Sequence, residues 1–311
     1  MRNLFITDPL ATIDVASDTS SLLMMTGLDL GQEIWLATPE DLLQKKEGLF
    51  ASAMKVKSVS DETGYELDAA EDLMILDGFD VVWLRKDPPF DTKYILHLAL
   101  FDQLVDTKIL FVNQPSSVRE LNEKLSIFWF PEYAPETIVT GTLSKVKEFW
   151  QQHGDIVVKS LIGFGGDSVE RIENWEDSET DVTTMLANGY IMAQPFLPEV
   201  YDGDLRVYLV NGKIIGSLLR VPQTSFRGNL HAGGRADVGK PNAKQEKIAL
   251  EVAQFLKSKG VFFAGIDFVG DYLTEINVTS PGVIREANAV SGMRLDKIIW
   301  NEILQLKNDA K

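Results

Sequence analysis

The stretch that decides the fold of this chain runs from Val261 to Val278 and reads Val-Phe-Phe-Ala-Gly-Ile-Asp-Phe-Val-Gly-Asp-Tyr-Leu-Thr-Glu-Ile-Asn-Val. Two apolar runs, Val261–Phe268 and Leu273–Val278, flank a short segment that contains glycine and aspartate. Runs of this length separated by such a segment are typical of a β-hairpin. Acidic and amide side chains interrupt the apolar runs, so this hairpin is also the most informative place to look for a site.

Side chains alternate along a strand, so Glu275 and Asn277 share one face, about 7 Å apart, while Ile276 faces the other way. A carboxylate and an amide oxygen side by side suit Mg²⁺, a hard cation that takes oxygen ligands. Asp267 joins them if the connection Gly270-Asp271-Tyr272 is a three-residue loop, because Asp267 then lies opposite Glu275. A two-residue loop would turn Asp267 to the other face. The alternative interpretation is the polar face of an ordinary hairpin.

Outward from the hairpin, the chain from about Asn122 onward shows short strands mixed with helices. Asn211-Gly212 is typical of a hairpin turn. Asn242 with Gln245 resembles a capping box and Gly260 stands where a helix ends, which predicts an amphipathic helix between them. This part therefore has an α+β character. Further strands are predicted at Asp155–Lys159, Ser168–Arg171, Tyr190–Gln194, Leu205–Val210 and Ile214–Val221, and a last helix near Leu295–Leu306.

The N-terminal third alternates short apolar runs with helical patterns, which predicts a parallel sheet with crossover helices. Loops after such strands tend to carry ligand contacts, and Arg85–Asp91 and Asn113–Pro115 occupy that place. The predicted strands are Leu4–Thr7, Ile34–Ala37, Val81–Leu84 and Ile109–Val112, and the predicted helices are Ser17–Leu30, Thr92–Val105 and Ser116–Phe130.

A glycine-rich segment joins the first two strands of the α+β part. Its glycines, Gly163, Gly165 and Gly166, would let the backbone approach a ligand and present N–H groups to phosphate. The spacing matches neither GxxxxGK[ST] nor GxGxxG, because Ser168 stands where the third glycine would be. The segment also leads into a strand rather than a helix. A plain glycine turn is the alternative interpretation.

Two lysines next to apolar residues, Lys124 and Lys159, could neutralise nucleotide phosphates as point charges. For each lysine taken singly, a solvated surface position is the favoured interpretation.

Two longer segments have the composition of binding elements. Gln194-Pro195-Phe196-Leu197-Pro198 ends a strand with two prolines that remove backbone donors, so this rigid segment could present a few backbone groups to an adenine edge or serve as an interdomain linker. The segment Arg220–Arg235 is rich in arginine and glycine and poor in aliphatic residues. It predicts either a lid over a polyanion or a disordered surface loop.

Composition narrows the class of partner. The 311 residues carry a formal charge of −16, which disfavours nucleic acid and anionic membranes as partners. Cysteine is absent and histidine occurs three times, so disulfides, thiolate metal sites and a cysteine nucleophile are excluded. There is no apolar run long enough to cross a bilayer and no signal-peptide pattern, so we expect a cytoplasmic location.

These features occur in the order found in the ATP-grasp superfamily, and the chain resembles prokaryotic glutathione synthetases from end to end. The most specific stretches are Leu84–Asp91, Leu121–Leu125, Arg227-Gly228-Asn229 with Gly233-Gly234-Arg235, and Leu273–Pro281. The resemblance implies an N-terminal Rossmann-like domain at 1–121, an ATP-grasp lid subdomain at 122–195 and a C-terminal ATP-grasp subdomain with a metal site at 196–311.

The resemblance also implies roles for individual residues. Catalytic arginines would be Arg206, Arg220 and Arg235. ATP would be bound by Lys124, Lys159, Gly163, Gly165, Gly166, Ser168, Gln194, Pro195, Phe196, Leu197 and Asp204. Substrate would contact Arg85, Asp87, Arg227, Asn229, Ser280 and Arg285. The metal ligands would be Asp267, Glu275 and Asn277.

The implied reaction joins γ-glutamylcysteine to glycine, with ATP as co-substrate and Mg²⁺ (or Mn²⁺) as cofactor, in a homo-oligomer that by resemblance is a tetramer. A carboxylate is a poor electrophile, so phosphoryl transfer to it would give an acyl phosphate that the amine attacks. Two alternatives remain: a related ligase that extends a different peptide, and a non-catalytic ATP-binding protein on the same fold.

Overall fold

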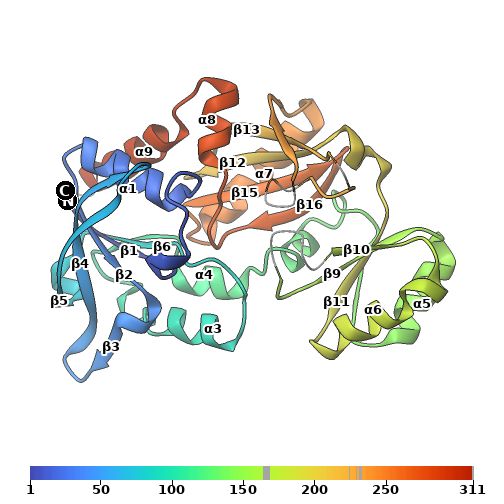
Figure 1. Cartoon of the computed structure of the whole chain (residues 1–311), viewed down its shortest axis with the longest axis horizontal. Helices are drawn as coiled ribbons and strands as arrows, with labels where there is room; N and C mark the ends of the chain where they lie inside the picture. The colour runs from blue at the N-terminus through green and yellow to red at the C-terminus, as the bar shows by residue number, and fades with distance from the viewer. Residues whose placement is uncertain (164–168, 224, 229, 231–232, 310–311) are drawn as a thin grey trace.

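The computed structural model describes residues 1–163, 169–223, 225–228, 230 and 233–309 of the chain. Its strands form separate sheets, which lie side by side in Figure 1 with the N-terminal sheet at one end and the sheet of β9, β10 and β11 at the other. Within the described residues, no helix is both long and apolar enough to span a membrane.

The N-terminal sheet has the strand order β3-β4-β2-β1-β6-β7, with β5 paired to β4. The prediction of parallel strands is confirmed for β1 (Arg2–Ile6), β2 (Glu33–Ala37), β6 (Val81–Leu84) and β7 (Leu110–Val112). The sheet also has an antiparallel extension that was not predicted, formed by β3 (Leu42–Lys45), β4 (Gly48–Ser60) and β5 (Gly64–Met74). Strand β5 reads Gly-Tyr-Glu-Leu-Asp-Ala-Ala-Glu-Asp-Leu-Met, rich in residues that disfavour strands, and only its pairing with β4 overrides that preference.

The predicted helices of this half are present but shorter than expected: α1 (Thr19–Asp29), α3 (Thr92–Ala99) and α4 (Pro115–Glu120). The helix predicted over Ser116–Phe130 is broken, with a 3₁₀ turn at Leu125–Trp129 after α4. Asn122 Oδ1 accepts the backbone N–H groups of Lys124 and Leu125, each at 3.1 Å, so its side chain caps a new turn. This break is where Lys124 lies.

The small sheet has the order β10-β9-β11-β8 and is antiparallel throughout. Its strands are β8 (Ile138–Thr140), β9 (Ile156–Ser160), β10 (Val169–Ile172) and β11 (Ile191–Pro195). Two helices that sequence analysis missed, α5 (Leu143–His153) and α6 (Trp175–Ala187), pack on one face through Phe149 and Trp175. The other face of the small sheet is turned toward the rest of the chain (Figure 1).

The third sheet has the order β14-β13-β12-β15-β16. Its strands are β12 (Asp204–Val210), β13 (Lys213–Val221), β14 (Arg235–Asp237), β15 (Phe263–Val269) and β16 (Tyr272–Asn277). The predicted two-residue turn at Asn211-Gly212 is confirmed, and both residues have positive φ, 49° and 79°. Helix α7 (Ala243–Ser258) covers one face, with the predicted capping box at Asn242 and Gln245.

The other face of this sheet shares a core with the N-terminal sheet through α8 (Ile284–Ser291), which was not predicted, and α9 (Leu295–Asp309). Helix α9 packs on α1, where Trp300 Nε1 donates to Leu23 O at 2.8 Å. A Cβ on Gly27 would lie 2.5 Å from the Trp300 ring, so the close approach of the two helices requires glycine. The first and last parts of the chain thus fold as one unit, which fixes the loop after β6 against the β15–β16 hairpin.

Candidate functional site: a cation and carboxylate cluster between two cavities

The β15–β16 hairpin places Asp267 directly opposite Glu275. The turn itself is the two-residue Gly270-Asp271, since Val269 pairs with Tyr272. The expectation that a two-residue turn would face Asp267 away is therefore wrong. A β-bulge at Thr274 inserts one residue between the pairs Phe268–Leu273 and Asp267–Glu275 and restores the register. Thr274 Oγ1 also donates to Asp267 O at 3.1 Å.

Asp267 is the centre of a buried charge cluster. Arg206, its register partner on β12, donates through Nε to Oδ1 at 2.8 Å and through Nη2 to Oδ2 at 2.6 Å. Arg220 Nη2 lies 2.9 Å from Asp267 Oδ2 and also pairs with Asp204. Asp204 and Arg206 lie on β12, Arg220 lies on β13 and Asp267 lies on β15, and these strands are neighbours in one sheet, so the backbone itself presets the cluster.

Burial and pairing act oppositely on the two carboxylates. Burial alone would raise the pKa of Asp267, but the charges and hydrogen bonds of Arg206 and Arg220 bring this pKa down to about 2. For Asp204, burial dominates over the charge of Arg220 and raises the pKa to about 6. Asp204 Oδ1 has no hydrogen-bond partner among the described residues.

Both predicted lysines approach the cluster. Lys124 is buried, pairs with Glu123, donates to Gly163 O at 3.0 Å and lies 4.0 Å from Glu275 Oε1. Burial opposes the charge on Lys124, yet Glu275 and Glu123 together raise its pKa. Burial lowers the pKa of Lys159, and the nearby Lys124 charge adds to this effect. A desolvated lysine beside carboxylates is suited to receive phosphate.

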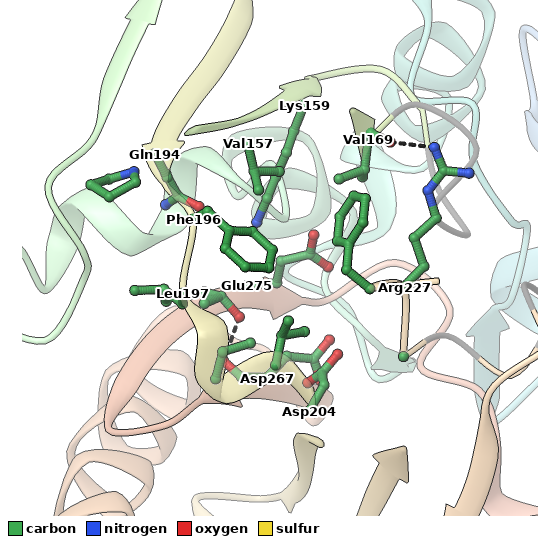
Figure 2. A pocket seen from close by; sticks show the side chains of 16 residues that line it. Val157, Lys159, Val169, Gln194, Phe196, Leu197, Asp204, Arg227, Asp267 and Glu275 are labelled. Atoms are coloured by element: carbon green, nitrogen blue, oxygen red, sulfur yellow. Dashed lines mark hydrogen bonds between the residues drawn. The ribbon is translucent and has the colours of Figure 1, made fainter. Parts of the chain in front are cut away.

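Two cavities meet at this cluster. The first, called the grasp cavity, lies between the small sheet and the third sheet; Figure 2 shows Lys159, Gln194 and Phe196 around it, with Asp204 and Asp267 below and Glu275 between them. Its wall is completed by Val157, Val169, Pro195, Leu197, Val200, Phe226, Arg227, Gly228, Val269 and Thr274. The mixture of apolar walls and convergent polar groups is typical of a cofactor or nucleotide site.

The second, called the central cavity, lies between the N-terminal sheet and the third sheet. It is polar and lined from the N-terminal side by loops at 7–20 and 85–89, and from the other side by Glu123, Lys124, Val169, Arg206, Arg220, Leu230, Glu275, Asn277, Thr279, Ser280, Gly282 and Val283. Val169 and Glu275 line both cavities. Glu275 therefore stands at their junction.

Most predicted site residues line one of these cavities. Lys159, Gln194–Leu197, Asp204, Arg227 and Asp267 line the grasp cavity, and Arg85, Asp87, Lys124, Arg206, Arg220, Asn277 and Ser280 line the central one. Gly163 contacts Lys124 through its carbonyl. Gly165, Gly166, Ser168 and Asn229 lie outside the described residues.

Besides Gly163, two predicted arginines line neither cavity. Arg235 is exposed on β14, where it pairs with Asp237 at 2.8 Å. Arg285 instead ties α8 to the N-terminal half, donating to Asp18 O and Val15 O and pairing with Asp61 at 3.0 Å. One residue of the site was not predicted: Glu123 is buried against Lys124, and its only signal in the sequence is an acidic residue directly before that lysine.

The predicted metal ligands fit a hard cation. Among the described residues, no group of three or more histidine, cysteine, aspartate or glutamate side chains is placed to hold a metal ion. The predicted set of ligands is instead two carboxylates, Asp267 and Glu275, and the amide of Asn277. Arg206 and Arg220 occupy three of the four lone-pair sites of Asp267, while Glu275 is partly exposed at the cavity junction. A few protein oxygens completed by phosphate and water is the coordination that Mg²⁺ favours.

Comparison with solved structures identifies the fold. The fold is that of ATP-grasp ligases: it matches the ligase PsnB in complex with a minimal precursor variant, Mg and ADP with a TM-score of 0.65 at 15% identity over 98% of both chains. It also matches D-alanyl-alanine synthetase A from Vibrio cholerae with a TM-score of 0.61 at 14% identity, over 99% of this chain and 97% of that one.

Sequence comparison then gives the family. Residues 1–119 match the family model of the prokaryotic glutathione synthetase N-terminal domain, and residues 123–292 match that of its ATP-grasp domain. Glutathione synthetase of Vibrio cholerae is 39% identical over 301 residues, covering 94% of this chain and 95% of that protein, and the Salmonella typhi protein is 38% identical over 303 residues, covering 94% and 96%. The chain belongs to the prokaryotic glutathione synthetase family, and it is an ATP-dependent ligase.

Proposed function

We propose that this chain joins γ-glutamylcysteine to glycine, with ATP converted to ADP and phosphate. The observation that carries the proposal is the place of Glu275 at the junction of the two cavities. A group transferred from a nucleotide in the grasp cavity to a carboxylate in the central cavity has to pass this point. The family relationship supports the choice of the dipeptide and of glycine as substrates.

The nucleotide would bind in the grasp cavity. Gln194–Leu197 would hold the adenine, which is planar and apolar enough for the wall formed by Val157, Phe196 and Val269. Lys124, Lys159 and the Gly163–Ser168 segment would contact the phosphates, with Asp204 near the ribose or the phosphates. The two lysines supply positive charge to a polyanion in a protein whose net charge is −16.

The peptide carboxylate would bind in the central cavity beside Arg206 and Arg220. The γ-phosphoryl group is transferred to this carboxylate oxygen, which breaks the bond to ADP. The glycine amine then attacks the acyl carbon, phosphate leaves, and the amine proton passes to solvent or phosphate. In this reaction no side chain forms a bond to the substrate, so the contribution of the protein is positioning and neutralisation of charge. Arg85, Asp87, Arg227, Asn229 and Ser280 would serve the substrates, whereas Arg235 and Arg285, which line neither cavity, are left out of this assignment.

Asp267, Glu275 and Asn277 would hold Mg²⁺, or Mn²⁺ in its place, and the bound cation would neutralise charge on the transferring phosphoryl group.

We also propose the division into 1–121, 122–195 and 196–311, a cytoplasmic location and a homotetramer, each supported by the family relationship. Sedimentation of the purified chain tests the tetramer.

The proposal is tested by measuring ADP release with γ-glutamylcysteine, with and without glycine, and by identifying glutathione as the product. Glycine-dependent release with one glutathione per ADP supports it. Release only with another amino-acid acceptor would point to a related peptide ligase. ATP binding without any release would point to a non-catalytic nucleotide-binding protein.

A further inference from the structure

The side chain of Asn122 joins two parts of the proposed nucleotide site. Its Oδ1 accepts the backbone N–H groups of Lys124 and Leu125, each at 3.1 Å, and so caps the turn on which Lys124 lies. Its Nδ2 donates to Leu161 O at 2.9 Å, where the chain leaves β9 and enters the glycine-rich segment. Both lone pairs of Oδ1 and one N–H of Nδ2 are therefore used within the protein, which fixes the orientation of the amide.

The ammonium group of Lys124 is held from the same two sides. The turn that carries it is fixed to the β15–β16 hairpin by the main chain, because Ile276 N donates to Glu123 O at 2.9 Å. Nζ bonds to the Glu123 carboxylate and donates to Gly163 O at 3.0 Å. An ammonium group has three N–H donors. Among the described residues no third acceptor lies within hydrogen-bond distance of Nζ, since Glu275 Oε1 is 4.0 Å away.

The third N–H of this ammonium group is available to a ligand at the junction of the two cavities. Lys124 lines the central cavity beside Glu275, which lines the grasp cavity as well. The place and direction of Nζ depend on the turn that carries Lys124 and on the Gly163 carbonyl that bonds to Nζ. Asn122 fixes both, because it caps the turn and holds Leu161, two residues before Gly163.

Asn122 itself lines neither of the two cavities. We infer that it is a positioning residue, whose three hydrogen bonds set the place from which Lys124 Nζ donates to the nucleotide phosphates. The inference rests on the proposed function, in which Lys124 contacts these phosphates. A main-chain bond from Phe90 N to Ile162 O, at 3.3 Å, holds the same segment and remains in every Asn122 variant, so a substitution should shift the ammonium group rather than release the segment.

The test is a double-mutant cycle of Asn122→Ala, Lys124→Met and the two changes combined. Titration calorimetry measures the affinity of each variant for a non-hydrolysable ATP analogue with Mg²⁺, and Tm is measured without nucleotide. The matched control is Asn174→Ala, which removes an asparagine cap outside both cavities, where Oδ1 accepts from Glu176 N at 3.1 Å. A conservative variant, Asn122→Ser, keeps an oxygen that can cap the turn but is too short to reach Leu161 O.

Asn122→Ala should weaken binding of the analogue about tenfold, because two backbone N–H groups and the Leu161 carbonyl lose their partner. In Lys124→Met the same change should weaken binding by less than about twofold, since the group that Asn122 positions is gone. Asn122→Ser should recover part of the affinity. Asn174→Ala should lower Tm as Asn122→Ala does, yet bind the analogue within about twofold of wild type.

Wild-type affinity in Asn122→Ala, an equal loss with and without the Lys124 ammonium group, or an equal loss in Asn174→Ala would each overturn the inference. The first and third of these comparisons stand even if Lys124→Met fails to fold. Wild-type affinity in Lys124→Met would remove the phosphate contact of Lys124, and the inference with it. Failure of the proposed reaction is seen separately. A chain that shows the non-additive loss but makes no glutathione keeps Asn122 in this role, whereas a chain that makes glutathione without that loss gives up only this inference.

Discussion

Arg206 holds both carboxylate oxygens of Asp267, through Nε at 2.8 Å and Nη2 at 2.6 Å, and the two residues are register partners on adjacent strands. The pair is almost fully buried and shares Arg220 as a third member. A two-bonded arginine–carboxylate pair is geometrically specific, so it fixes where positive charge lies at the edge of both cavities.

Replacing Asp267 with asparagine should destabilise the fold as well as abolish activity. The variant leaves two buried guanidinium groups with a neutral partner, and breaking a buried ion pair costs about 3–5 kcal/mol. Urea denaturation measures the loss. The matched control is Asp237→Asn, which breaks the exposed pair with Arg235 and should leave the free energy of unfolding nearly unchanged. Equal stability of the two variants would show that the buried cluster is not the structural centre of the site.

Replacing Glu275 with glutamine should separate activity from stability. Its side chain is partly exposed at the cavity junction, so the free energy of unfolding should change little. The loss of charge at the proposed metal site should lower kcat about a hundredfold or more. Glu251→Gln, on the far surface of α7, is the control and should retain wild-type kcat. A rate near wild type for Glu275→Gln would remove this residue from the mechanism.

The period-two pattern of β16 was enough to predict that Glu275 and Asn277 share a face, because strand geometry is local. The face of the hairpin on which Asp267 lies depends on a β-bulge at Thr274, and no local sequence pattern predicts this bulge. The pairing of Arg206 and Arg220 with Asp267 joins residues about 47 to 61 positions apart in the chain and follows only from sheet order. Likewise β5 is a strand only because β4 is beside it, and α9 completes a core that begins at Phe5.

Gly27→Ala should destabilise the chain without changing its kinetics. The added methyl group would meet Trp300 at 2.5 Å and Ile34 at 2.9 Å, so α1 and α9 would have to separate. Overpacking of this kind costs about 1–3 kcal/mol. Gly78→Ala is the control, since its nearest contact is an ordinary 3.7 Å to Leu73. Thermal unfolding should show a lower Tm for Gly27→Ala alone, and equal Tm values would contradict the close packing of the two helices.

His97 should make the fold sensitive to mild acid. Burial against Tyr94, aided by the charge of Lys86, lowers the pKa of His97 from 6.5 to about 4. The unfolded chain therefore binds a proton between these two pH values while the folded chain does not. The free energy of unfolding should fall as the pH drops from about 6.5 to 4, by about 2–3 kcal/mol from this residue.

The contribution of His97 is isolated by comparison with His97→Gln. Buried carboxylates whose pKa is raised, such as Asp204, act in the opposite direction and are common to both proteins. Urea denaturation at pH 7, 5.5 and 4.5 should show the difference between wild type and variant changing steadily in favour of the variant. A difference independent of pH would mean that His97 takes up its proton in the folded state.

In the proposed reaction, a carboxylate bound in the central cavity receives the phosphoryl group of a nucleotide bound in the grasp cavity. This transfer can be followed by labelling the cysteine carboxylate of γ-glutamylcysteine with ¹⁸O and analysing the released phosphate by mass spectrometry. We expect one ¹⁸O atom in each phosphate formed together with glutathione, because the oxygen that accepts the phosphoryl group leaves with it. Glutathione formed together with unlabelled phosphate would rule out this transfer.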